Sequence, residues 1–154
     1  MQNAGSLKQS PSITKTQGKV CLTQSPQGVV VGRGDMTITI QPLQASDKSD
    51  WRHLWHDYLK FYDSTVSKDV YDTTFERLLS PQHPKQNAFI AFAESHTVGL
   101  VHYIYHPHNW KREDVCYLQD LYAVPESRGQ GVGRALIEAV YKLPMPMAHQ
   151  RSIG

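Results

Sequence analysis

A glycine-rich segment near the end of the chain combines the residue types that bind phosphate. Glycines occupy positions 129, 131 and 133, between Arg128 and Arg134. Glycine lets the backbone approach a ligand closely, because it has no side chain. A helical pattern follows, and the N-terminus of a helix offers free N–H groups and the positive end of its dipole. Together with the donors of the two arginines, these features predict an anion site that suits phosphate.

Two common phosphate-binding loops do not fit this spacing. No Lys-Ser or Lys-Thr pair follows the last glycine, which excludes a Walker P-loop. Arg134 stands where a dinucleotide fingerprint has its third glycine, and no βαβ unit follows. The remaining alternative is a glycine loop that caps the helix and binds no ligand.

The first predicted elements come from the spacing of apolar residues. An alternating stretch over 36–41 predicts a strand, and aromatic and aliphatic residues at helical spacing over 51–62 predict a helix. Ser46 is predicted to cap this helix. A second helix is predicted to begin near Thr73, where Glu76 completes a capping box.

The second half of the chain predicts most of the sheet. Strands are predicted over 88–93, 98–106 and 115–124, and a helix over 131–143. The full order is therefore β-α-α-β-β-β-α. This order predicts an α+β fold, with a mixed, mostly antiparallel sheet flanked by helices.

Composition narrows the function classes. The chain has 154 residues, enough for one domain, with 19% charged residues, 40% hydrophobic residues and a formal net charge of +2. So small a charge gives no reason to expect nucleic acid as a partner. No apolar run approaches the ~20 residues that cross a membrane, so we expect no membrane partner. Two cysteines far apart in the sequence favour a reduced, cytoplasmic location.

The first 35 residues differ from the rest of the chain. They carry four basic side chains, one acidic side chain and no aromatic residue. Such a segment buries too little apolar surface to offset its ordering entropy, so we predict that residues 1–35 are a disordered N-terminal extension. Residues 36–143 are predicted to form the folded domain, and residues 144–154 an unstructured tail.

Three histidines, at positions 102, 106 and 108, suggest a metal site at first sight. His102 and His106 would share one face of a strand, but four residues of strand separate them by ~13 Å, too far for one ion. We therefore predict no metal site.

The run Arg128-Gly-Gln-Gly131-Val-Gly133 resembles the acetyl-CoA-binding signature of the GNAT superfamily of N-acetyltransferases, Arg/Gln-x-x-Gly-x-Gly/Ala. The run from Tyr117 to Ser127 resembles the fourth strand of that family and its exit. The resemblance implies a GNAT-like acyl-CoA N-acyltransferase fold. It also implies an acyltransferase that moves an acetyl group from acetyl-CoA, the co-substrate, to a primary amine by direct attack in a ternary complex. The acceptor is expected to be a small-molecule or peptide amine.

The resemblance also assigns roles to residues. The loop amides would hold the pyrophosphate of coenzyme A, and the strand before the loop would pair with the pantetheine arm. The residues expected to bind the cofactor are Leu121, Tyr122, Ala123, Val124, Arg128, Gly129, Gln130, Gly131, Val132, Gly133 and Arg134. Asp120 is expected to act as base or amine anchor, against the alternative that it only caps or pairs locally. Trp55, Tyr58 and Tyr62 are expected to line the acceptor site, although core packing explains them as well.

In that family the fold continues past the helix that follows the glycine loop. Here, Pro144 and Pro146 follow the helix and disfavour a strand. We therefore expect a domain that lacks the C-terminal strands and helix, with impaired activity. The alternatives are a catalytically inactive CoA-binding module and a strand-edge interaction module. A homodimer is also among the expected states.

Overall fold

The main sheet lies at the centre of the molecule. The computed structural model describes residues 13–16, 19–22, 29–32 and 36–144. The main sheet has the strand order β3-β4-β5-β6-β7, and a separate hairpin joins β1 and β2. The strands are β1 (Ile13–Thr16), β2 (Lys19–Leu22), β3 (Val29–Gly32), β4 (Thr37–Pro42), β5 (Gln86–Ala93), β6 (His96–His106) and β7 (Val115–Ala123).

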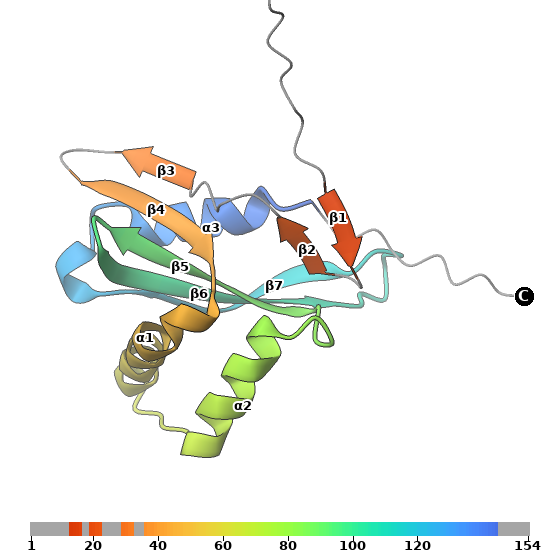
Figure 1. Cartoon of the computed structure of the whole chain (residues 1–154), viewed down its shortest axis with the longest axis horizontal. Helices are drawn as coiled ribbons and strands as arrows, with labels where there is room; N and C mark the ends of the chain where they lie inside the picture. Colours follow the sequence, from red (N-terminus) through yellow and green to blue (C-terminus); the bar gives the residue numbers. More distant parts are fainter. Residues whose placement is uncertain (1–12, 17–18, 23–28, 33–35, 145–154) are drawn as a thin grey trace, which may run out of the picture.

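Helices cover both faces of the main sheet (Figure 1). α1 (Lys48–Phe61) and α2 (Lys68–Leu79) lie on one face, and α3 (Val132–Tyr141) lies on the other. Successive residues of a strand point to opposite faces, so β6 contributes Leu100 to the core under α1 and α2, and Val101 to the core under α3. The predicted α+β class and the order β-α-α-β-β-β-α from residue 36 onward are confirmed.

The direction of the strands differs in one respect from the prediction. We expected a mixed sheet, but the strand pairs of the described residues are all antiparallel. The reason is that α1 and α2 return the chain to the end of β4 that it left, so that Pro42 at the end of β4 pairs with Phe89 near the start of β5. A single crossover helix would have produced a parallel pair.

Two helix starts also differ from the prediction. A short 3₁₀ turn, Ala45–Asp47, precedes α1. In this turn Asp47, not Ser46, accepts a hydrogen bond from a backbone N–H, at 2.8 Å. α2 begins at Lys68 rather than near Thr73, and an i,i+4 ion pair from Lys68, at 2.7 Å, stabilises its first turn.

The segment that we predicted to be disordered contains strands in its described part. β3 pairs with β4 and widens the main sheet, and β1 pairs with β2. The run of valines at positions 29–31 has high β propensity, which the polar composition of the whole segment hides. The remainder of this segment and residues 145–154 of the predicted tail lie outside the described residues. The domain boundary at residue 36 stays a prediction.

Among the described residues, no helix is both long and apolar enough to cross a membrane.

Candidate active site

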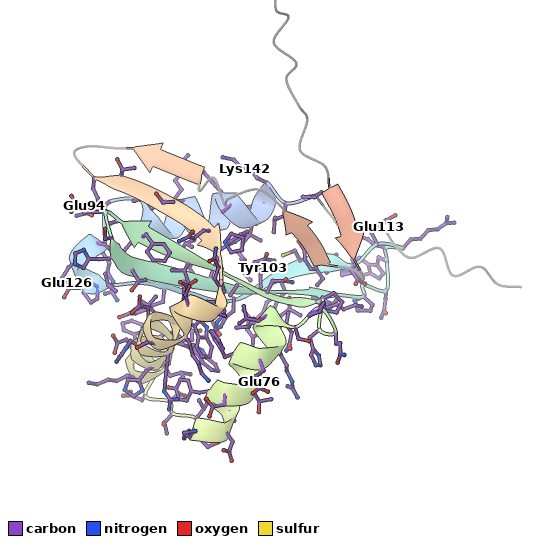
Figure 2. The ribbon with its side chains drawn as sticks, viewed as in Figure 1. Glu76, Glu94, Tyr103, Glu113, Glu126 and Lys142 are labelled. Carbon is purple, nitrogen blue, oxygen red and sulfur yellow. The ribbon has the colours of Figure 1, made fainter. Side chains whose placement is uncertain are left out.

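The glycine-rich loop connects the last strand of the sheet to α3. After β7 the chain forms a 3₁₀ turn, Pro125–Ser127, and α3 begins at Val132. Gly129 and Gly131 have φ values of +81° and +85°. This left-handed region strongly favours glycine, so two of the three glycines are required by the backbone itself. Figure 2 shows Glu126, just before the loop, at the same end of the sheet as Glu94, with Glu113 at the other end.

The loop presents unpaired backbone donors beside open space. The first intrahelical bond of α3 runs from the N–H of Ala135 to the C=O of Gly131, at 2.9 Å. The N–H groups of Val132, Gly133 and Arg134 therefore have no acceptor within the helix. A Cβ atom placed on Gly131, or on Gly129, would meet nothing within 4 Å. This geometry fits a diphosphate, which needs several donors and room at the mouth of a helix.

The two arginines of the loop already have partners in the protein. The Nε atom of Arg128 donates to the C=O of Ala123 at 3.3 Å, and its guanidinium carbon lies 5.7 Å from the centre of the Phe61 ring. Arg134 pairs with Glu138 at 2.8 Å. Each guanidinium has five N–H donors, so both can still contribute to an anion site, but the backbone supplies its core.

The edge of β7 decides which backbone groups a ligand can reach. β7 is the last strand of the main sheet, so one of its edges has no partner among the described strands. The N–H of Val124 donates to Val98 at 2.9 Å, and its C=O accepts from Ser127 at 3.0 Å. Both backbone groups of Val124 are therefore occupied, and its predicted pairing with pantetheine does not fit this geometry.

The backbone groups of successive residues in β7 point alternately toward β6 and toward the open edge. This alternation decides which of Leu121, Tyr122 and Ala123 can pair with a ligand. Tyr122 pairs with Leu100 in the same register, so its backbone groups face β6. Leu121 and Ala123 alternate with it, so their N–H and C=O groups face the open edge. The contact from Arg128 to the C=O of Ala123 agrees with this direction. The predicted pantetheine edge is thus reduced to Leu121 and Ala123.

A β-bulge places Asp120 on the face covered by α1. His102 pairs with Asp120 and Tyr103 with Leu118, so Gln119 is an extra residue on β7. Without the bulge, Leu118 and Tyr122 would share one face, since they are an even number of residues apart. Leu118 instead packs with the α3 core and Tyr122 with the α1 core.

Asp120 ends a buried chain of hydrogen bonds. The indole N–H of Trp51 donates to Nε2 of His102 at 2.8 Å, and Nδ1 of His102 lies 2.7 Å from Oδ2 of Asp120. An indole nitrogen can only donate, so Nε2 must accept and Nδ1 carries the ring proton. His102 therefore donates to the carboxylate. His102 is 4% exposed, which keeps water from competing for this hydrogen bond.

The surroundings favour the ionised form of Asp120. Burial alone would raise the pKa of this carboxyl, but the hydrogen bond from His102 and the electrostatic attraction between the two groups, with smaller contributions from Tyr58 and Trp55, outweigh burial, so the pKa lies below its ordinary value. Burial and the neighbouring Asp120 charge raise the pKa of Tyr58 to about 12, so this phenol keeps its proton. The site therefore has one carboxylate beside neutral donors.

The predicted acceptor residues lie at different depths along α1. Trp55 is buried, with its ring centre 5.3 Å from that of His102. Its indole N–H lies close enough to Asp120 to lower the pKa of the carboxyl, yet it has no partner at hydrogen-bonding distance among the described residues. Tyr58 is half-buried, and its ring centre lies 5.1 Å from that of Tyr62. Tyr62 itself is mostly exposed. The structure thus brings Trp55 and Tyr58 to Asp120, with Tyr62 further out.

The sequence reasoning missed His102 and Trp51 as members of this site. His102 was considered only as a metal ligand, and Trp51 only as a core residue. In the described part of the chain, no group of three or more His, Cys, Asp or Glu side chains could hold a metal ion. A hairpin that joins the strands 98–106 and 115–124 brings His102 to the part of the strand that holds Asp120, but a regular register would pair His102 with Gln119, and only the bulge puts it opposite Asp120.

The comparisons with known proteins agree with this geometry. The sequence profile of the acetyltransferase (GNAT) family matches residues 50–145. The chain belongs to this family. It is 34% identical over 105 residues to the D-amino-acid N-acetyltransferase HPA3 of Saccharomyces cerevisiae, over 68% of this chain and 65% of the relative. The chain thus spans less than two thirds of the length of that curated relative. The range matched by the family profile, residues 50–145, contains the glycine loop, Trp51, His102 and Asp120.

Solved structures show the same fold. The aminoglycoside N-acetyltransferase AAC(6')-Iy in complex with CoA has a TM-score of 0.59 and 24% identity, covering 72% of this chain and 70% of that chain. A ribosomal-protein-alanine N-acetyltransferase from Brucella melitensis biovar Abortus 2308 has a TM-score of 0.57 and 22% identity, covering 68% of this chain and 69% of that chain. The resemblance to the GNAT superfamily and the predicted fold class are confirmed.

Proposed function

We propose that this chain moves an acetyl group from acetyl-CoA to a primary amine. The observation that carries the proposal is the juxtaposition of three features: a glycine loop with free amides, the open edge of β7, and the carboxylate of Asp120 at the bulge of the same strand. The similar proteins are named for acceptors as different as D-amino acids, aminoglycosides and a protein alanine, and each is an N-acetyltransferase. An amine nitrogen is the acceptor that these names share.

Acetyl-CoA would lie along β7 with its diphosphate at α3. The N–H groups of Val132, Gly133 and Arg134 would bind the diphosphate. The edge groups of Leu121 and Ala123 would pair with the amides of the pantetheine arm, as an added strand does. The bond from Arg128 to Ala123 would then give way to the pantetheine amide.

The acceptor amine would bind at Asp120. A lysine-like amine has a pKa near 10.4, so it arrives as an ammonium ion that a half-buried carboxylate attracts. Attack requires the neutral amine, and Asp120 is placed to take the proton directly or through water. The nitrogen then bonds to the thioester carbonyl carbon and the carbon–sulfur bond breaks. The nitrogen loses its second proton, directly or through water, to the departing thiolate, so that CoA leaves as the thiol. Trp55 and Tyr58 would form the wall of this acceptor site, with Tyr62 at its entrance.

Three further parts of the proposal rest on the sequence rather than on this site. They are a cytoplasmic location, a small-molecule or peptide acceptor without nucleic acid or membrane, and a homodimer. The homodimer stays a prediction that the mass of the protein in solution would test.

The experiment combines calorimetry with acetyl-CoA and a turnover assay over a panel of primary amines. We expect binding and turnover, and we expect Asp120→Asn to lower kcat/KM for the amine by about 100-fold while acetyl-CoA still binds. Glu113→Gln is the matched control, because it removes one negative charge at the other end of the sheet and should leave turnover unchanged. Binding without turnover would favour the inactive CoA-binding module, and no binding would overturn the proposal.

A further inference from the structure

A buried indole and a buried imidazole stand behind the carboxylate that we assign to the acceptor site. Trp51 is 1% exposed and His102 is 4% exposed, so neither can touch a substrate. We propose that Trp51 fixes the charge of the acceptor site by holding His102 in its neutral form, so that Asp120 keeps a net negative charge for the ammonium ion of the acceptor. Trp51 and His102 are thus positioning residues, and this inference rests on the proposed acetyl transfer.

The geometry of the hydrogen bonds carries the inference. Nε2 of His102 lies 2.8 Å from the indole nitrogen of Trp51, which has a proton and no lone pair to offer. A proton on Nε2 would set two N–H donors against each other at that distance. The imidazolium form of His102 is therefore incompatible with this contact, whereas the neutral form with its proton on Nδ1 satisfies both Trp51 and Asp120.

The same geometry blocks a proton relay. A relay through His102 would have to receive a proton on one ring nitrogen and release one from the other. Nε2 already accepts the Trp51 bond, and the ring is enclosed by Trp51 and Trp55, with ring centres 6.0 Å and 5.3 Å away. Hence a proton taken by Asp120 cannot continue inward, and it has to leave toward the acceptor side.

Among the described residues around His102, no carboxylate other than that of Asp120 lies against the ring to neutralise an imidazolium charge. β5 presents Ala88 opposite His102. The titratable or charged groups that the structure places next to His102, or one contact further out, are Asp120 on β7, Arg52, His56 and Tyr58 on α1, and Tyr71 on α2. Arg52 and His56 contact Tyr71 rather than His102, and burial raises the pKa of the Tyr71 phenol. Asp120 is the carboxylate in direct contact with the ring.

Removing the indole donor should therefore make the site sensitive to pH. In Trp51→Phe, Nε2 loses its donor and becomes free to take a proton, with the imidazolium then paired to Asp120. An unrestrained histidine titrates near pH 6.5. The imidazolium and the carboxylate together carry no net charge. Once the imidazolium has formed, the ammonium ion of the acceptor is therefore no longer attracted to Asp120.

The first experiment measures KM for the amine between about pH 8 and about pH 6, the range in which histidine changes charge. We expect KM in Trp51→Phe to rise about tenfold or more over this range relative to the native protein, with KM for acetyl-CoA unchanged. Trp51→Phe/His102→Asn should lose this pH dependence, since the asparagine amide can donate to Asp120 but cannot be protonated. Trp110→Phe, which changes an exposed tryptophan, is the matched control. Identical pH profiles for the native protein and Trp51→Phe would overturn the inference.

A second measurement does not depend on turnover. Heteronuclear NMR of the imidazole rings distinguishes the two neutral tautomers and the imidazolium, and His102→Asn identifies the signal of His102 among the eight histidines. Over the pH range of the first experiment, we expect the native ring to carry its proton on Nδ1 alone, as its contacts with Trp51 and Asp120 require. A native ring that becomes an imidazolium while Trp51 is in place overturns the inference, whether or not the protein acetylates amines and whether or not Trp51→Phe folds. A protein that acetylates no amine but holds this tautomer would overturn the proposed function alone.

Discussion

The charge of Asp120 results from opposing effects of its neighbours. Burial destabilises the carboxylate, whereas the hydrogen bond and electrostatic attraction from His102 and the hydrogen bonds from the α1 side chains stabilise it, and their sum favours the ionised form. A carboxylate held in this way attracts an ammonium ion strongly but is a weak base. Binding and orienting the amine is therefore the larger part of its proposed role, with proton removal assisted by water.

This balance predicts how acid unfolds the protein. Because the folded pKa of Asp120 is depressed below its unfolded value of about 3.9, its ionised form stabilises the fold above that value, and this stabilisation disappears as pH falls through the folded pKa. Urea unfolding should show that the stability difference between the native protein and Asp120→Asn shrinks between about pH 5 and the folded pKa.

A sign reversal provides the control. In His102→Leu the principal donor is lost, so burial should raise the pKa of Asp120 above its unfolded value. The carboxylate would then lower stability above the unfolded pKa, and the His102→Leu protein should become more stable as pH falls through the raised value. If the free energy of unfolding changed with pH in the same direction in the native protein and in His102→Leu, His102 would not control the pKa of Asp120.

Individual residues also set the limit of what the sequence could predict. Asp120 and the glycine loop could be predicted as candidates because their signals are local: a carboxylate in an apolar strand, and glycines spaced before a helix. His102 was missed because its partner lies 18 residues further along, and the two side chains meet only in the register that the bulge at Gln119 creates. A bulge depends on the packing of a whole sheet, and no local pattern specifies it.

At the scale of elements, the strands and helices from residue 36 onward were predicted in the right number and order, but less well at their ends. α1 is preceded by a 3₁₀ turn, and an ion pair stabilises the first turn of α2. Neither feature shows in the spacing of residues, so the prediction placed the helix starts at the capping residues Ser46 and Thr73 instead. The strands within residues 13–32 were missed because the composition of the whole segment concealed short runs of β-favouring residues. The antiparallel sheet followed from how α1 and α2 return the chain, which spacing does not reveal.

The contact between α3 and the sheet depends on Gly99. A Cβ atom at this position would lie 2.7 Å from the backbone O of Tyr122 and 2.8 Å from a methyl carbon of Val132. A backbone oxygen cannot move aside as a flexible side chain does, so Gly99→Ala should strain the pairing of β6 with β7 at Tyr122. The contact with Val132 should also push the first turn of α3 away from the sheet. We expect a loss of about 1–3 kcal/mol in the free energy of unfolding and weaker binding of acetyl-CoA.

Urea unfolding and calorimetry would measure both effects of Gly99→Ala. Gly133→Ala is the control for stability, because its Cβ would come no nearer than 4.0 Å to its closest neighbour, a methyl carbon of Leu121, and alanine favours a helix. Equal stability of the two variants would contradict the close approach at Gly99.

At the scale of the whole molecule, the sheet carries one core on each face, and the proposed site draws on both layers. α1 supplies the wall near Asp120, and α3 supplies the amides of the glycine loop on the opposite face (Figure 1). β7 is the element common to both, since the bulge directs Asp120 to one face while the open edge runs toward the loop. Ligand binding along β7 should therefore stabilise the fold as a whole, by about 2.7 kcal/mol when acetyl-CoA is at 100 times its Kd.

Hydrogen exchange along β7 tests this arrangement amide by amide. The N–H of Val124 is bonded to Val98, and that of Tyr122 faces β6, so both should exchange slowly with or without ligand. The N–H groups of Leu121 and Ala123 face the open edge, so they should exchange fast in the free protein and slow down when acetyl-CoA binds. With 3′-phospho-ADP, which lacks the pantetheine arm, the first turn of α3 should gain protection while the edge of β7 does not. Protection of the loop by both ligands, with no change at the edge for either, would mean that pantetheine does not pair with β7.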